Sequence, residues 1–167
     1  MGKIAGLYGA AAGVFIIASL TVFGATDPVI SRLIGYATIA IGLSVIFFAV
    51  KRHRDLNKAG AISFLGAFLA GLAVAGVAGL TYVIGWEVYL YATDYRFMEE
   101  YAQNAIARQE AAGLSGNDLD AFVKTTEEMM KGYRNPAFRI PITFLEIFPV
   151  GFAISALSAF FLKRKNG

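Results

Sequence analysis

Four long apolar runs dominate the chain, and the charged residues lie almost entirely between them. The runs cover residues 4–24, 33–50, 60–84 and 140–162. Each is close to the length of about 20 residues that a helix needs to cross the hydrocarbon core of a bilayer. None shows the alternation of polar and apolar residues that is typical of a membrane-spanning strand. The pattern therefore predicts an all-α integral membrane protein, a bundle of four transmembrane helices.

The first run has a second interpretation, a cleaved signal peptide. It is longer than the apolar region of a typical signal peptide, and Phe23 stands where a small residue should precede a cleavage after Ala25. We therefore expect the run to be retained as a membrane span. Asp27 and Pro28 separate it from the second run.

The segment between the third and fourth runs, about residues 94–135, has a helical pattern of its own. Phe97 and Tyr101 are four residues apart and so lie on one helix face. Residues 113–116, with the sequence GLSG, predict a turn, and a second amphipathic helix follows with Asn117 as its expected N-cap. The segment is thus predicted to be an external helical hairpin. Its apolar face needs a partner: the other arm, a second copy of the chain, or another protein.

The positions of Lys and Arg predict the orientation of the spans. With both termini in the cytoplasm, Lys3, the patch at 51–58 and the tail at 163–165 lie on the cytoplasmic side. That side then holds eight basic residues and one acidic residue, whereas Arg32 and the segment 94–136 lie outside. This distribution follows the positive-inside rule. The patch also contains His53, which we expect to face solvent and lipid headgroups.

The composition agrees with a membrane protein and excludes several kinds of chemistry. Hydrophobic residues make up 57% of the chain and charged residues 16%, against about 45–50% and about 25% in soluble domains. The chain has no cysteine and one histidine, so disulfides, thiolate metal sites and Cys/His nucleophile pairs are excluded. The basic residues lack interleaved aromatic residues, which argues against nucleic-acid binding. We therefore expect no catalytic residues, no cofactor and no metal site.

Small residues recur at every fourth position in two of the spans and predict close helix packing. They are Ala67, Gly71, Ala75 and Gly79 in the third run, and Gly151, Ser155 and Ala159 in the fourth. Such ridges let helix backbones approach one another closely in lipid. We favour packing within one chain over the seam of a homodimer, although the spacing fits both.

Four ionisable residues near the outer membrane boundary form the candidate polar cluster: Glu87, Glu146, Arg139 and Arg134. Counting about 20 residues back from Lys163 places Glu146 roughly one turn inside that boundary. Arg139 precedes Glu146 by seven residues, which places the two on nearly the same helix face. Because a carboxylate in hydrocarbon needs a partner, we expect Glu146 to form a structural tie with Arg139, Arg134 and tyrosine hydroxyls. The alternative is a proton or cation site.

Two motifs give the chain a family resemblance. The first is Gly85-Trp86-Glu87-Val88-Tyr89, after the glycine-rich third run, and the second is Tyr133-Arg134-Asn135-Pro136, followed by TFLEIFPVG at residues 143–151. With the basic loop before them and the basic tail after them, they make nearly the whole chain resemble a bacterial family known as domain of unknown function 4199. The resemblance implies a small integral protein of the bacterial inner membrane. Together with the orientation predicted from Lys and Arg, this places the hairpin in the periplasm. It implies no activity or ligand.

These observations favour a non-enzymatic accessory, assembly or interaction component that acts through its external hairpin. Its expected partners are the lipid bilayer and either further copies of the chain or another membrane protein. The alternative is a small oligomeric transporter or ion-coupled protein that uses Glu146 and Glu87.

Overall fold

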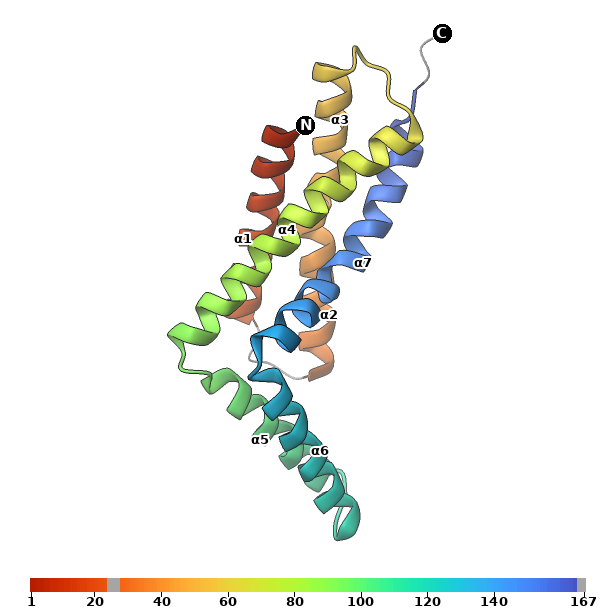
Figure 1. The fold of residues 1–167 in the computed structure, drawn as a ribbon. Coiled ribbons are helices and arrows are strands. Elements are labelled where there is room, and N and C mark those ends of the chain that lie inside the picture. Colours follow the sequence, from red (N-terminus) through yellow and green to blue (C-terminus); the bar gives the residue numbers. More distant parts are fainter. Residues whose placement is uncertain (24–27, 165–167) are drawn as a thin grey trace. The chain divides into compact units, whose positions relative to one another are not determined.

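The computed structural model describes residues 1–23 and 28–164. The secondary structure of these residues consists of α-helices (Figure 1). They are α1 (Gly2–Phe23), α2 (Pro28–Leu43), α3 (Val45–Asn57), α4 (Phe64–Ala92), α5 (Arg96–Ala111), α6 (Asn117–Tyr133) and α7 (Pro136–Leu162). The prediction of an all-α chain is confirmed for these residues. The predicted span end at Gly24, the break at Asp27 and the tail residue Lys165 lie outside the described part.

Four stretches of the described chain are long and apolar enough to cross a membrane. They are Gly2–Thr21, Leu33–Asn57, Phe64–Ala92 and Pro136–Leu162. The third and fourth stretches extend beyond the apolar runs at 60–84 and 140–162, because each helix continues into the polar residues that separate those runs. The motif residues Trp86 and Glu87, and likewise Arg139, therefore lie on helices rather than on loops.

The second stretch consists of two helices that meet at Ser44. This residue keeps right-handed helical angles, φ −57° and ψ −24°, and its Oγ donates a hydrogen bond to the Ile41 carbonyl at 2.6 Å. A serine bonded back to the preceding turn bends a helix without ending it. Beyond the apolar run, α3 continues to Asn57, so the basic patch lies on its last turns.

The chain forms two compact units. Unit 1 comprises the described residues of Met1–Gly85 and Phe144–Gly167, and unit 2 comprises Trp86–Thr143. Both boundaries fall inside helices, in α4 and in α7. The single membrane domain expected for residues 1–167 stays a prediction.

In unit 1, small residues allow α4 and α7 to approach closely. A Cβ atom added to Gly71 would lie 2.7 Å from the Oγ of Ser155, and one added to Gly151 would lie 2.7 Å from the Cβ of Ala75. Real Cβ atoms do not approach that closely, so neither glycine can gain a side chain without a shift of the helices. The other members of the two series, Ala67, Gly79 and Ala159, are buried as well. These contacts lie within one chain.

α1 packs on α4 in the same way. A Cβ atom on Gly9 would lie 2.7 Å from the Val74 carbonyl oxygen, and one on Gly13 would lie 2.6 Å from the Ala78 carbonyl oxygen. The rest of the unit 1 core is aliphatic, with Ile16 and Leu43 among its fully buried side chains. Backbone contact at small residues is how helices associate where apolar side chains gain nothing over lipid.

In unit 2, α5 and α6 pack against each other as an antiparallel hairpin (Figure 1). The turn between them contains Gly113 at φ +94° and Gly116 at φ +60°, angles that favour glycine. Gly116 is the N-cap of α6, and Asn117 is the first helical residue. The prediction of Asn117 as the N-cap was therefore wrong, because Gly116 turns the chain into the helix one residue earlier.

The close approach of α4 and α7 leads to a stability prediction. Gly71→Leu should lower the free energy of unfolding in detergent by about 1–3 kcal/mol, because the new side chain must push Ser155 away. Gly76→Leu is the matched control, since it makes the same change on the same helix at a position with no atom within 4 Å of an added Cβ. Thermal unfolding followed by circular dichroism measures both. Equal melting temperatures for the two variants would show that this face of α4 is not packed.

Candidate functional site

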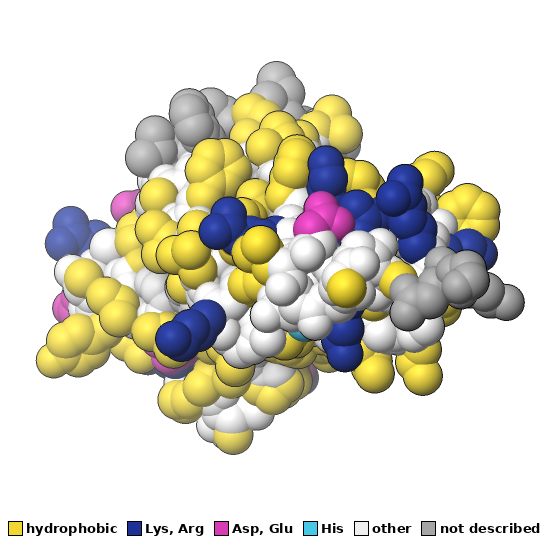
Figure 2. Space-filling model, turned by 90° about the horizontal axis from the view of Figure 1, so that it is seen from above, with side chains coloured by type: hydrophobic (Ala, Val, Ile, Leu, Met, Phe, Trp, Pro, Cys, Tyr) yellow, Lys and Arg dark blue, Asp and Glu magenta, His cyan; other side chains and the backbone are white. Residues whose placement is uncertain are grey.

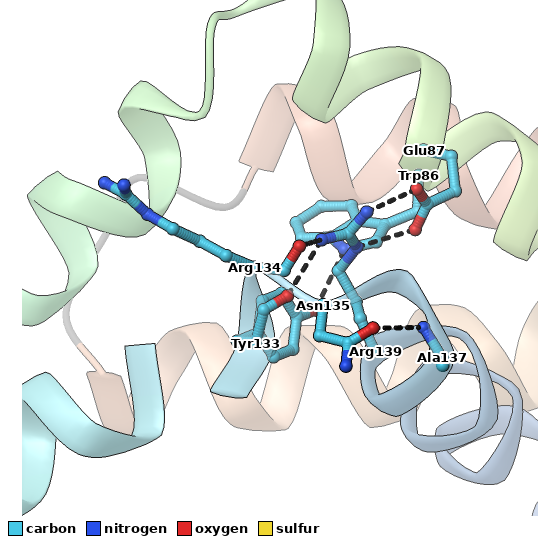
Figure 3. Close-up of polar contacts among 7 residues, drawn as sticks. All are labelled: Trp86, Glu87, Tyr133, Arg134, Asn135, Ala137 and Arg139. Carbon is cyan, nitrogen blue, oxygen red and sulfur yellow. Dashed lines mark hydrogen bonds and ion pairs between the residues drawn. The ribbon is translucent and has the colours of Figure 1, made fainter. Parts of the chain in front are cut away.

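The polar site of unit 2 is built around a buried arginine. Arg139 lies in the first turns of α7, has no exposed surface, and is the largest fully buried side chain among the described residues. A charge removed from water must be neutralised and hydrogen-bonded. Glu87 on α4 does both: the Nε of Arg139 donates to Oε1 at 2.7 Å, and Nη2 donates to Oε2 at 2.5 Å (Figure 3). Two parallel bonds of this kind form the strongest arginine–carboxylate arrangement.

The remaining terminal nitrogen of Arg139 binds the end of another helix. Its Nη1 donates to the carbonyl oxygens of Tyr133 at 2.8 Å and of Arg134 at 3.3 Å (Figure 3). These carbonyls lie at the C-terminal end of α6, where a helix has no N–H groups of its own to satisfy them and where its dipole favours a cation. Arg139 therefore connects α4, α6 and α7.

Aromatic rings enclose the guanidinium group. The Cζ atom of Arg139 lies 5.5 Å from the ring centroid of Tyr95 and 5.8 Å from that of Tyr133, within cation–π range. The indole N–H of Trp86 donates to the Tyr133 hydroxyl at 3.0 Å. These rings help to bury the guanidinium of Arg139, whereas the side chain of Glu87 remains 28% exposed. The low polarity around the guanidinium strengthens its electrostatic attraction to the carboxylate.

The backbone beside this site is strained. α4 ends with hydrogen bonds from the Tyr95 N–H to the Leu90 carbonyl at 2.9 Å and from the Asp94 N–H to the Tyr91 carbonyl at 3.2 Å. This is a Schellman arrangement, in which glycine normally takes the left-handed position. Here Asp94 and Tyr95 are both left-handed, at φ +50° and +58°. Such angles cost about 1–3 kcal/mol per residue, and the contact of the Tyr95 ring with Arg139 helps to hold them.

The two other members of the predicted cluster have side-chain partners of their own. The side chain of Arg134 is 70% exposed and forms a 3.4 Å ion pair with Glu99, so that only its carbonyl belongs to the buried site. In unit 1, Glu146 accepts a hydrogen bond from the Tyr82 hydroxyl at 3.4 Å. The spacing within α7 favoured Glu146 as the partner of Arg139, but the structure gives this place to Glu87. Spacing along one helix does not show which acidic residue another helix supplies.

His53 is buried, contrary to expectation. Its residue exposure is 8%, and its Nδ1 atom has no hydrogen-bond partner in the part of the chain that the structure describes. It shares an inward face of α3 with Ile46 and Val50, so the helical period places it in the core although its sequence neighbours are basic. Within the same described residues, no group of three or more His, Cys, Asp or Glu side chains could hold a metal ion.

The hairpin carries a feature that the sequence analysis missed, a groove of about 340 Å³ between α5 and α6. Its lining includes the apolar side chains Met98, Ala102, Ile106 and Met130. The charged residues that line it are Glu99, Glu127 and Arg134, and Glu99 is paired with Arg134. The four-residue spacing of Met98, Ala102 and Ile106 is the signal in the sequence that could have revealed it.

The comparisons with known proteins identify a family but no relative of known function. The family model described as "Protein of unknown function (DUF4199)" matches residues 5–164, which confirms the resemblance of the two motifs. No curated protein matches the chain significantly, and no solved structure does.

The buried ion pair should dominate the stability of unit 2. Glu87→Gln should lower the free energy of unfolding in detergent by about 3 kcal/mol, because it leaves the Arg139 guanidinium without a counter-charge. Hydrogen exchange should also become faster at the end of α6 and the start of α7. Adding Arg139→Gln to this variant should restore part of the loss, since the unpaired charge is then removed.

Glu99→Gln is the matched control for Glu87→Gln. It also removes one carboxylate from an ion pair with arginine, but both partners of that pair are largely exposed. Its effect should therefore stay within about 1 kcal/mol. If Glu87→Gln proves as mild as Glu99→Gln, the Arg139–Glu87 pair does not hold unit 2 together.

Proposed function

Since the chain belongs to the family described as "Protein of unknown function (DUF4199)", whose description states no activity, we propose its function from the structure. It is a non-enzymatic membrane protein, an accessory, assembly or interaction component that binds its partner through the α5–α6 hairpin. The observation that carries this proposal is the groove of about 340 Å³ between these helices, whose lining combines apolar side chains with the charged residues Glu99, Glu127 and Arg134.

The composition of the hairpin suits a partner of particular chemistry. α5 carries three acidic and two basic residues, and α6 carries four acidic and two basic residues. The groove adds exposed or half-buried apolar side chains to this negative charge. A protein segment that presents apolar side chains flanked by Lys or Arg complements both features, and charge complementarity also speeds association and excludes wrong partners.

The buried site supports the same function by holding the base of the hairpin. Arg139 binds the last carbonyls of α6 and is itself held by Glu87. A binding surface that is ordered before its partner arrives loses less conformational entropy on association. The hydrogen bonds and the ion pair of Arg139 therefore position the binding surface and have no part in a reaction.

The arrangement of the acidic residues does not favour the ion-coupled alternative. Glu87 neutralises a buried guanidinium, and releasing it to bind an ion would leave that charge unpaired, which is costly. Of the two acidic residues named for this alternative, Glu87 and Glu146, only Glu146 would then remain to bind an ion. We therefore keep the interaction component as the proposed function.

We further propose that the hairpin lies in the periplasm of a bacterium and that both termini lie in the cytoplasm. The distribution of Lys and Arg supports this orientation across the inner membrane. Because the chain has no cysteine, single variants report only the introduced thiol. In intact cells, a membrane-impermeant thiol reagent should label Asn117→Cys and not Asn57→Cys. The reverse labelling pattern would invert the topology.

Cross-linking from the groove tests the proposed partner. With p-benzoylphenylalanine in place of Met98, which lines the groove, ultraviolet light should form an adduct with another membrane protein in native membranes. The same amino acid in place of Thr125, which is exposed on α6 outside the groove lining, should form much less.

A charge reversal separates groove binding from random collision. Glu127→Lys, at the groove, should lower the yield of the Met98 adduct about tenfold, because like charges at an interface repel. Glu128→Lys is the matched control, since it makes the same change at the next residue, which does not line the groove. Equal yields for the two reversals would count against recognition by the groove.

A further inference from the structure

Two basic segments that are far apart in the sequence are joined in unit 1. The backbone N–H of Ile62, in the connection between α3 and α4, donates to the Arg164 carbonyl at 3.0 Å. The Arg164 N–H donates to the Ile62 carbonyl at 2.9 Å. The buried guanidinium of Arg54 adds a bond from Nη1 to the carbonyl of Leu162, the last residue of α7, at 3.4 Å. Leu162 and Arg164 are thus fixed beside the segment that follows α3.

This junction concentrates positive charge at one end of unit 1. Five exposed basic side chains belong to it: Lys51, Arg52 and Lys58 from the α3 side, and Lys163 and Arg164 from the α7 side. Asp55 is the one acidic residue of the two segments, and it is already paired with Arg54 at 2.7 Å. Figure 2 looks onto this end and shows Lys and Arg side chains gathered around an acidic one.

The charged residues follow directly on apolar, lipid-compatible surface. Phe160 and Phe161, at the end of α7, are 59% and 69% exposed, and Phe48 on α3 is 59% exposed. The Nζ of Lys163 lies 4.9 Å from the ring centroid of Phe160. A basic side chain at the end of an apolar helix lies at the level of the lipid headgroups. An anion bound here would therefore meet apolar surface on its membrane side.

We propose that this end of unit 1 is a binding site for the headgroup of an anionic phospholipid, with basic residues of α3 and of the α7 tail on the phosphate and the exposed phenylalanines beside the acyl chains. A phosphodiester suits the site because lysine and arginine supply several N–H donors. The combination with adjacent apolar surface favours a lipid over a soluble anion. This proposal is independent of the partner bound by the hairpin.

Binding of defined lipids to the purified full chain tests the site. In dodecyl maltoside, native mass spectrometry should show tighter binding of dioleoylphosphatidylglycerol than of dioleoylphosphatidylcholine, which has the same acyl chains. Each basic residue removed should weaken phosphatidylglycerol binding about fivefold. The double variants Lys163→Gln with Arg164→Gln, and Lys51→Gln with Arg52→Gln, should therefore each weaken it about 25-fold.

Lys124→Gln with Lys131→Gln is the matched control, since it removes two positive charges from exposed positions of α6. Binding by this variant should stay within about twofold of the unchanged chain, because these residues lie outside the site. An equal loss would show that net charge alone attracts the lipid and would overturn the proposal. Equal binding of the two lipids by the unchanged chain would overturn it as well.

Two further measurements complete the test. Glycerol 3-phosphate has the phosphate but no acyl chains, and it should not displace phosphatidylglycerol. If it does so efficiently, the site binds a soluble anion and the lipid assignment is wrong. If a variant fails to fold, the salt dependence of lipid binding by the unchanged chain tests the proposal instead. Its preference for phosphatidylglycerol should decrease as the sodium chloride concentration is raised. A preference that salt does not alter would contradict the proposal.

Discussion

A fully buried guanidinium cannot remain uncompensated, and the structure of unit 2 follows from this requirement at Arg139. Glu87 supplies the counter-charge through two parallel hydrogen bonds. The last carbonyls of α6 accept hydrogen bonds from Nη1 of Arg139. The rings of Tyr95 and Tyr133 lie beside the guanidinium group. This one side chain connects α4, α6 and α7. If α6 moved away from α4 and α7, the guanidinium would lose hydrogen-bond partners while still buried, which is costly.

Arginine has a comparable role in unit 1. Arg54 is buried and binds the carbonyl of Leu162 at the end of α7, just as Arg139 binds the carbonyls at the end of α6. A cation at a helix C-terminus satisfies carbonyls that lack partners and interacts favourably with the helix dipole. Both buried arginines thus fix helix ends and have carboxylate partners of their own. Under the proposed function, these contacts hold in place the groove on the hairpin and the basic end of unit 1.

Much of the fold could be predicted from local sequence. The apolar runs predicted the four membrane-compatible helices, because the length of a run and its hydropathy decide whether a helix can cross a bilayer. Small residues at every fourth position predicted the contact at Gly71 and Gly151, since only small side chains let backbones come so close. The turn at 113–116 followed from its glycines. All of these signals lie within a few helical turns of the chain.

The candidate site depended on contacts that no local pattern contains. Arg139 was identified as important, but Glu87, which lies 52 residues away along the chain, became its partner because of the way α4 and α7 come together. The joining of Ile62 to Arg164 is a further result of long-range packing. The burial of His53 and the groove between α5 and α6 do follow helical spacing, but that spacing alone does not show what packs against each face. The sequence alone shows which charged residues will need a partner if they are buried. Which residue becomes the partner depends on the distance between the two side chains and on how far each is removed from water. Both are decided only when helices from separate parts of the chain pack together.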